Sequence, residues 1–225
     1  MANLKFSQFT EQTDTANVQF LVGYNGSDNV RITPNNALSA YLPLSGGTLT
    51  GNLIVDTSSV TIGLNNTASN NSLAIGELSD ANGYASLASG YDTTASAAAS
   101  TALGAVTTAS GLNSFVTGST GTASGQDSAA FGFGTTASGN QSFAIGYEAT
   151  ASGASSFAGG GPTTLASGEN AFAFGADVDV IGAHSAGFGR LHDIDGNENL
   201  VGGVSNIVNG DANLVGGALN DLNNK

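Results

Sequence analysis

The hydrophobic and polar positions of this chain follow one short pattern that returns every 14 residues. The unit reads bulky, small, bulky, glycine, as in Phe143, Ala144, Ile145 and Gly146. Side chains alternate between the two faces of a strand, so one face carries the small residues and the other carries the bulky ones. About five residues lie between successive corners, too few for a stable helix. The pattern therefore predicts short β-strands.

Glycine marks two corners in each unit. It is the residue that turns sharply or adopts a positive φ at least cost, so each main glycine is expected at or beside a corner. A second series lies half a period away, at positions such as Gly83 and Gly111, and one extra residue near Pro162 shifts both series. The predicted coil corners include Gly76, Gly90, Gly104, Gly118, Gly132 and Gly146.

Short strands joined by regular corners predict a parallel β-solenoid in which each coil hydrogen-bonds to the next. About eleven units run from Thr61 to Leu222. At ~4.8 Å per coil they would make a rod of roughly 50 Å. The predicted fold class is all-β: a β-roll of 14-residue coils over 61–225, preceded by a small N-terminal β attachment module at 1–41 and a connecting β segment at 42–60.

The inside of so narrow a coil admits only small residues such as Ala130 and Ala144. The bulky face then points outward, where a ladder of phenylalanines exceeds the apolar patch that a soluble monomer usually exposes. The same ladder on another copy would cover it, which predicts a parallel homo-oligomer. The alternative is a monomeric solenoid with the phenylalanines inside. The predicted interface residues are Phe115, Phe131, Phe143, Phe157, Phe172, Phe174 and Phe188.

The segments NSLAIG, DSAAFG and QSFAIG, which end at Gly76, Gly132 and Gly146, alternate with TASG. This alternation resembles the YadA-like head repeat of trimeric autotransporter adhesins, and the resemblance covers about two thirds of the chain. It implies a left-handed parallel β-roll with three chains around one axis. The expected partner is therefore two further copies of this chain.

Other segments resemble parts of tailed-bacteriophage virion proteins. LPLSGGTLTGNLIV, from Leu42 to Val55, is similar to a segment frequent in tail-fibre proteins, and ANVQFLVGYNGSDNVRITPNNAL to the leading segments of virion structural proteins. The N-terminus has no apolar run of the kind a secretory signal needs. These resemblances imply a virion fibre made in the host cytoplasm, structural and not enzymatic, that contacts other virion proteins and a host-surface receptor or glycan. A binding module whose roll wall is the contact surface is the alternative.

The N-terminal segment has the alternation of a hairpin. Val30 and Ile32 resume an apolar alternation after the turn-rich YNGSDN. Such a module could grip a particle or cap the first coil. The predicted virion-anchor residues are Phe6, Phe9, Phe20 and Val22.

Composition excludes several functions. The chain has 17 acidic and 4 basic residues and a net charge of −13, which excludes nucleic-acid binding because phosphate contacts need cations. It contains no cysteine, so disulfides and thiolate sites are excluded. No apolar stretch is long enough to span a membrane. No cofactor is expected.

The segment HDIDGNEN offers the oxygen ligands that calcium prefers, at Asp193 and Asp195, but lacks the distant glutamate of a calcium loop. A solvated turn is the favoured interpretation and a metal site the weaker one. Asp177 and Asp179 raise the separate alternative of a carboxylate pair that cleaves a glycan. His184 occupies a polar corner position and is expected at the surface.

Overall fold

The computed structural model describes residues 21–24, 29–32 and 59–223, and no helix occurs among them. The chain divides into two compact units, Met1–Leu53 and Ile54–Lys225. In the first unit, β1 (Leu21–Tyr24) pairs antiparallel with β2 (Asn29–Ile32). The predicted hairpin is therefore present.

Only part of the predicted attachment module falls within the described residues. Val22 lies in β1, where its backbone pairs with that of Arg31. Phe6, Phe9 and Phe20 lie outside the described residues, as does almost all of the 42–60 segment. The anchor therefore stays a prediction.

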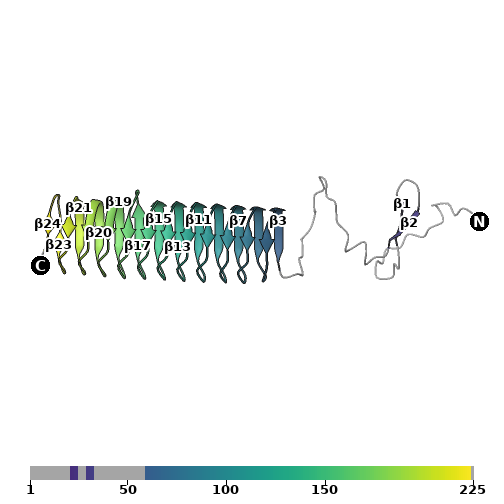
Figure 1. Cartoon of the computed structure of the whole chain (residues 1–225), viewed down its shortest axis with the longest axis horizontal. Helices are drawn as coiled ribbons and strands as arrows, with labels where there is room; N and C mark the ends of the chain where they lie inside the picture. Colours follow the sequence, from purple (N-terminus) through teal and green to yellow (C-terminus); the bar gives the residue numbers. More distant parts are fainter. Residues whose placement is uncertain (1–20, 25–28, 33–58, 224–225) are drawn as a thin grey trace, which may run out of the picture. The chain divides into compact units, whose positions relative to one another are not determined.

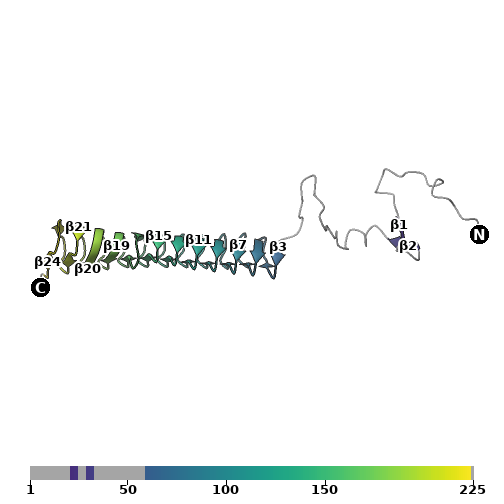
Figure 2. The ribbon, with the colours of Figure 1, turned by 90° about the horizontal axis from the view of Figure 1, so that it is seen from above.

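The second unit is a roll of parallel strands that form one 22-stranded sheet. Successive coils pair without any shift, so that Phe143 faces Phe157 and Ala144 faces Ala158. Figure 1 shows these strands side by side along the roll, and the view in Figure 2 shows that each coil is flattened. The prediction of an all-β parallel solenoid is confirmed.

One wall of the roll consists of the longer strands, most of which have five residues. In the coils between Leu73 and Tyr147 each of them has a small, buried second residue, alanine or valine, and glycine at its fourth position. These strands are β3 (Val60–Leu64), β5 (Leu73–Glu77), β7 (Leu87–Tyr91), β9 (Thr101–Ala105), β11 (Phe115–Ser119), β13 (Ala129–Phe133), β15 (Phe143–Tyr147), β17 (Phe157–Gly160), β19 (Phe172–Val180), β20 (Ala186–Ile194), β21 (Leu200–Val204) and β23 (Leu214–Val215).

The opposite wall consists of two-residue strands, and five consecutive ones have the sequence Thr-Ala. The coil of β3 lies at the predicted start of the roll, and its Gly63 pairs with Gly76 after 13 rather than 14 residues. The short strands are β4 (Thr67–Ala68), β6 (Asp80–Ala81), β8 (Thr94–Ala95), β10 (Thr108–Ala109), β12 (Thr122–Ala123), β14 (Thr136–Ala137), β16 (Thr150–Ala151), β18 (Leu165–Ala166), β22 (Ile207–Val208) and β24 (Asp221–Leu222).

The core is a double column of small side chains, one column from each wall. Ala130 and Ala144 from the longer strands and Ala123 and Ala137 from the short strands are fully buried. The phenylalanines lie outside this core, so the alternative of a phenylalanine interior is wrong. The cause is width: two walls joined by such short corners leave no room for an aromatic ring between them.

The main glycines stand at the fourth position of their strands. In the six predicted corner glycines φ lies between 116° and 142°, a region that side chains rarely adopt. A Cβ on any of them would overlap the carbonyl oxygen of the equivalent glycine in the next coil. The corner apex comes two residues later, at positions such as Leu78 and Asp92, with φ of 56° and 52°. Glycine is thus required beside the corner by the close approach of successive coils.

Near the C-terminal end the core residues become larger and two strands become longer. β19 and β20 each have nine residues, because pairing continues around the corner through Val178 and His192. Val178, Val180 and Ile194 are fully buried, and Gly187 faces them. A Cβ on Gly187 would lie 2.8 Å from Val178 Cγ1 and 2.9 Å from Ile194 Cδ1. Glycine on one wall therefore compensates for the added volume on the other, as dense packing requires.

Candidate functional site

The predicted interface residues all lie on the outer side of the longer strands. Phe115, Phe131, Phe143, Phe157 and Phe172 are half-buried, whereas Phe174 and Phe188 are 48% and 42% exposed. All but Phe174 form one ladder of rings, with centroid separations from 4.6 to 5.4 Å. Aromatic pairs at such separations contribute ~0.5–1.5 kcal/mol each beyond their buried area. We call this continuous outer strip the aromatic ladder.

The aromatic ladder changes position along the strands where a small residue leaves room. Phe115 faces Ala129 in the next coil, and the ring of that coil is Phe131, two positions later. Phe115 and Phe131 still stack, with ring centroids 5.2 Å apart. Gly159 has a related role: a Cβ there would lie 2.9 Å from the Phe157 ring and 3.1 Å from Ile145 Cγ2. The rings of the aromatic ladder thus pack against one another along the roll, while their outward side has no partner within the chain.

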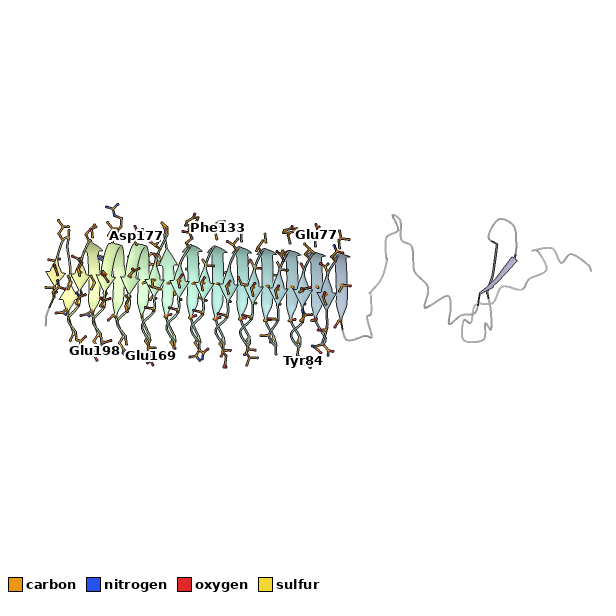
Figure 3. All side chains as sticks on the ribbon, viewed as in Figure 1. Glu77, Tyr84, Phe133, Glu169, Asp177 and Glu198 are labelled. Atoms are coloured by element: carbon orange, nitrogen blue, oxygen red, sulfur yellow. The ribbon has the colours of Figure 1, made fainter. Side chains whose placement is uncertain are left out.

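A second pair of rings lies at the corner that follows the longer strands. Phe133 and Tyr147 face each other in register and stack with centroids 5.2 Å apart and planes at 9°. They are 47% and 48% exposed. Figure 3 shows Phe133 projecting from the same edge of the roll as Glu77 and Asp177. Sequence reasoning missed this pair, although its position one residue after the main glycine repeats in both coils.

The opposite wall carries a ladder of hydroxyl groups. Thr108 faces Thr94 and Thr122, and the register continues through Thr136 and Thr150. Their side chains point outward and are half-buried, while the alanine that follows each is fully buried. Among the described residues these five hydroxyl groups have no hydrogen-bond partner. These hydroxyl groups make this wall the polar side of the roll, and we call it the threonine wall.

The acidic segment forms a small cluster on this polar side. Asp179 faces Asp193 in register, and Asp195 follows two residues later. Burial raises the pKa of Asp179 above its ordinary value, and the carboxylates of Asp193, Asp177 and Asp195 raise it further. Burial, the Asp195 carboxylate and a hydrogen bond with it raise the pKa of Asp193. In residues 59–223 no group of three or more acidic, histidine or cysteine side chains has the arrangement of a metal site.

The two histidines occupy different corners. His184 is exposed at a corner apex, as expected, with its Nε2 3.3 Å from Asn170 Nδ2. His192 is buried on the inside of the other corner, where its Nε2 lies 3.0 Å from the carbonyl oxygen of Phe188 and Nδ1 accepts from the Asn206 backbone N–H at 3.3 Å. The side-chain amide of Asn206 makes the two equivalent contacts one coil later. Its Nδ2 donates to the carbonyl oxygen of Gly202, and its Oδ1 accepts from the backbone N–H of Asn220. His192 thus replaces a structural asparagine.

Comparison with known families identifies the coils. The family model of the YadA head domain repeat matches residues 68–93, 81–107, 123–149, 141–161 and 161–177. In these segments the coils resemble that repeat, which together with the parallel solenoid supports a YadA-like β-roll. The YadA-like coils carry both the aromatic ladder and the threonine wall, so the same repeat supplies both faces.

The matched fold and family are those of a structural, adhesin-type β-roll rather than of a known enzyme class. No curated protein matches the chain. No helix that could cross a membrane occurs among the described residues.

Proposed function

We propose that this protein is the subunit of a homotrimeric fibre or spike on a tailed-phage virion, attached through its N-terminal module and involved in host attachment. The observation that carries the proposal is the aromatic ladder above an alanine core. The roll cannot turn these rings inward, because Ala130, Ala144 and Ala158 already fill the space between its walls. Only contact with another surface can remove these rings from water. Such burial contributes a favourable free energy of ~25 cal/mol per Å² of apolar area.

A second and a third copy of the chain are the covering surface in this proposal. The coils repeat at equal spacing, so an identical roll in parallel orientation offers matching rings at every level. The resemblance to the head repeat of trimeric adhesins supports three copies. A fibre of this kind has a mechanical role, and the narrow, filled core supports a structural rather than a catalytic function.

The virion setting is supported by the segments that precede the roll. LPLSGGTLTGNLIV resembles a tail-fibre segment, and the N-terminal stretch resembles leading segments of virion structural proteins. The attachment partner would be other virion proteins, contacted through residues 1–41. The roll would then present its polar wall to the surroundings, including the host surface.

Substituting one ring of the aromatic ladder tests the trimer. Phe143→Asp places a carboxylate in the proposed apolar interface, where an unpaired charge is strongly unfavourable. We expect sedimentation analysis to show monomers, and the melting temperature to fall. The matched control is Thr136→Asp on the polar wall of the preceding coil, which should leave both unchanged. A Phe143→Asp trimer with unchanged heat resistance would show that the rings are not the interface.

A binding module that uses the roll wall is the second candidate. The unpartnered hydroxyl groups of the threonine wall favour it, because they are free to bond a polar ligand. Replacing Thr108 and Thr122 by valine distinguishes the candidates. If the roll wall binds the host, this double variant should remain trimeric and lose attachment to host cells. If the fibre only carries a separate receptor-binding protein, the variant should still attach.

A further inference from the structure

One coil of the roll departs from the repeat. Gly160 pairs with Gly175, 15 residues later, whereas the other main glycines from Gly76 onward are 14 apart. In the preceding coil one residue, Tyr147, separates the main glycine from the positive-φ corner residue. Here two residues, Gly161 and Pro162, precede the corner residue, which is Thr163. The loop rises above the neighbouring corners beside β17 in Figure 1. We call it the Gly161–Pro162 bulge.

The bulge is bonded into the roll rather than loose. The backbone N–H of Gly161 donates to the carbonyl of Gly175, and that of Asp177 donates to the carbonyl of Pro162 at 3.1 Å. The Thr163 hydroxyl donates to the Asp177 carboxylate, which fixes that group beside the bulge. Bulges in β-structure concentrate next to functional sites, where they redirect side chains. A sequence that otherwise repeats so strictly is expected to break its own rule where function requires it.

The bulge interrupts the outer corner column between an aromatic ring and a cation. On one side is Tyr147, whose ring stacks on Phe133 of the preceding coil and is 48% exposed. On the other side, beyond Ala176, is Arg190, which faces Ala176 in register. Three coil rises separate Tyr147 from Arg190, roughly 14 Å. At Gly161 and Ala176, between them, side chains are absent or minimal.

Arg190 is unusual in this molecule. It is the only lysine or arginine from residue 59 to residue 223. Its guanidinium has no ion-pair or hydrogen-bond partner among the described residues. Glu148 and Asp177, on the adjacent corner column, add two carboxylate groups close to the bulge. The site therefore offers an exposed aromatic ring, two carboxylate groups and one multiple donor along three successive coil rises.

We infer that the Gly161–Pro162 bulge, with Tyr147 and Arg190 on either side, binds a neutral oligosaccharide. A sugar ring has an apolar face of C–H groups that can pack on Tyr147, and hydroxyl groups that can donate to Glu148 and Asp177 and accept from Arg190. A neutral ligand is favoured because a chain with a net charge of −13 and a single cation between residues 59 and 223 repels anions. Hydrogen bonds between a charged group and a neutral one are among the stronger polar contacts.

The inference deepens the proposed attachment function and rests on it, since a host-surface contact needs a ligand site. Each contact exchanges protein–water for protein–sugar bonds, so a single site would be weak. Three copies on one fibre would strengthen binding by multivalency. Weak single sites are thus compatible with firm attachment of a whole particle.

The test uses the purified full chain and saturation-transfer NMR with four neutral trisaccharides and one anionic trisaccharide. The neutral probes are cellotriose, chitotriose, maltotriose and mannotriose, and the anionic probe is trigalacturonate. We expect at least one neutral probe to bind and Tyr147→Ala to weaken it about tenfold, the scale of one lost ring contact. Deletion of Gly161, which restores the 14-residue spacing, should abolish the signal. The control Tyr91→Ala, at the same column in another coil, should bind as the unaltered chain does.

Three results would overturn the inference. They are no binding of any neutral probe, binding of trigalacturonate alone, and binding that is unchanged in both Tyr147→Ala and the Gly161 deletion. Sedimentation of the same samples reports the trimer separately. Monomers that still bind the sugar would contradict the proposed fibre and leave the site standing, whereas trimers that bind no sugar would do the reverse.

Discussion

Val106 adopts a φ of 56° at a corner apex, a conformation that β-branched residues rarely tolerate. The same apex position in other coils holds residues such as Asn65 and Asp92, which adopt this conformation more readily. Val106 is also 46% exposed, so packing within the chain does not explain it. The corner geometry is therefore imposed by the stacked coils, and single residues are forced to accept it.

Relieving this strain should stabilise the roll. Val106→Asn keeps the corner and removes the unfavourable β-branched conformation, so we expect the free energy of unfolding to rise by about 1 kcal/mol. The control is Val204→Asn, at the last position of β21, where φ is not positive and asparagine brings no such gain. Chemical denaturation measures both. Equal effects of the two variants would mean that the backbone conformation of Val106 is not strained.

At the scale of the element, equivalent positions of successive strands pair in register. A residue type that recurs at such a position therefore repeats the same contact, favourable or unfavourable, from coil to coil. The threonine rungs repeat a residue that suits strands. The rung from Asp179 to Asp193 repeats a carboxylate instead, and like charges that face each other in a sheet are destabilising. Burial and then the Asp193 carboxylate raise the pKa of Asp179, whereas burial and then the Asp195 carboxylate raise the pKa of Asp193.

This rung predicts a pH-dependent stability. The folded-state pKa of Asp193 is above its ordinary value of 3.8, so the folded chain binds the proton more tightly than the unfolded chain does. The contribution of Asp193 to stability is then greatest below pH 3.8 and is lost as pH rises through its raised folded-state pKa. Asp193→Asn should stabilise the roll by about 0.5 kcal/mol at pH 7. It should have no effect below pH 3.8, whereas Asp92→Asn, at a distant corner, should show no such pH-dependent gain in thermal melts.

The sequence predicts the strands and the core well, because a 14-residue period fixes the register and the narrow coil fixes which residues point inward. The alanine column at Ala130 and Ala144 follows directly from this. The long strands β19 and β20 and the shape of the Gly161–Pro162 bulge do not, since they depend on how the corner of one coil meets the next. The Phe133–Tyr147 pair was missed because the residue after the main glycine changes from coil to coil, for example from Ala105 to Ser119, so that this column has no constant aromatic character.

At the scale of the whole molecule, charge and apolar character are divided between the two units. From residue 59 to residue 223 the only lysine or arginine is Arg190, and from Thr94 to Thr150 the polar wall offers hydroxyl groups rather than large apolar side chains. The first 41 residues hold Lys5 and Arg31 and a concentration of apolar residues, among them Phe6, Phe9 and Phe20. A short segment with so many apolar residues usually buries them against a partner. Attachment and assembly therefore belong to different parts of the chain in the proposed fibre.

A chain that begins at Leu42 separates these two roles. Its coils retain every core alanine and the whole aromatic ladder, so we expect it to fold and to sediment as a trimer like the full chain. It lacks the apolar residues and cations of the first 41 positions, so it should fail to join virions when it is supplied in place of the full protein, as measured by its amount in purified particles. The control is Val106→Asn in the full chain, which alters a corner of the roll and should be incorporated normally. If the shortened chain were incorporated equally well, the roll itself would be the part that contacts the particle, and the N-terminal unit would be free for the host.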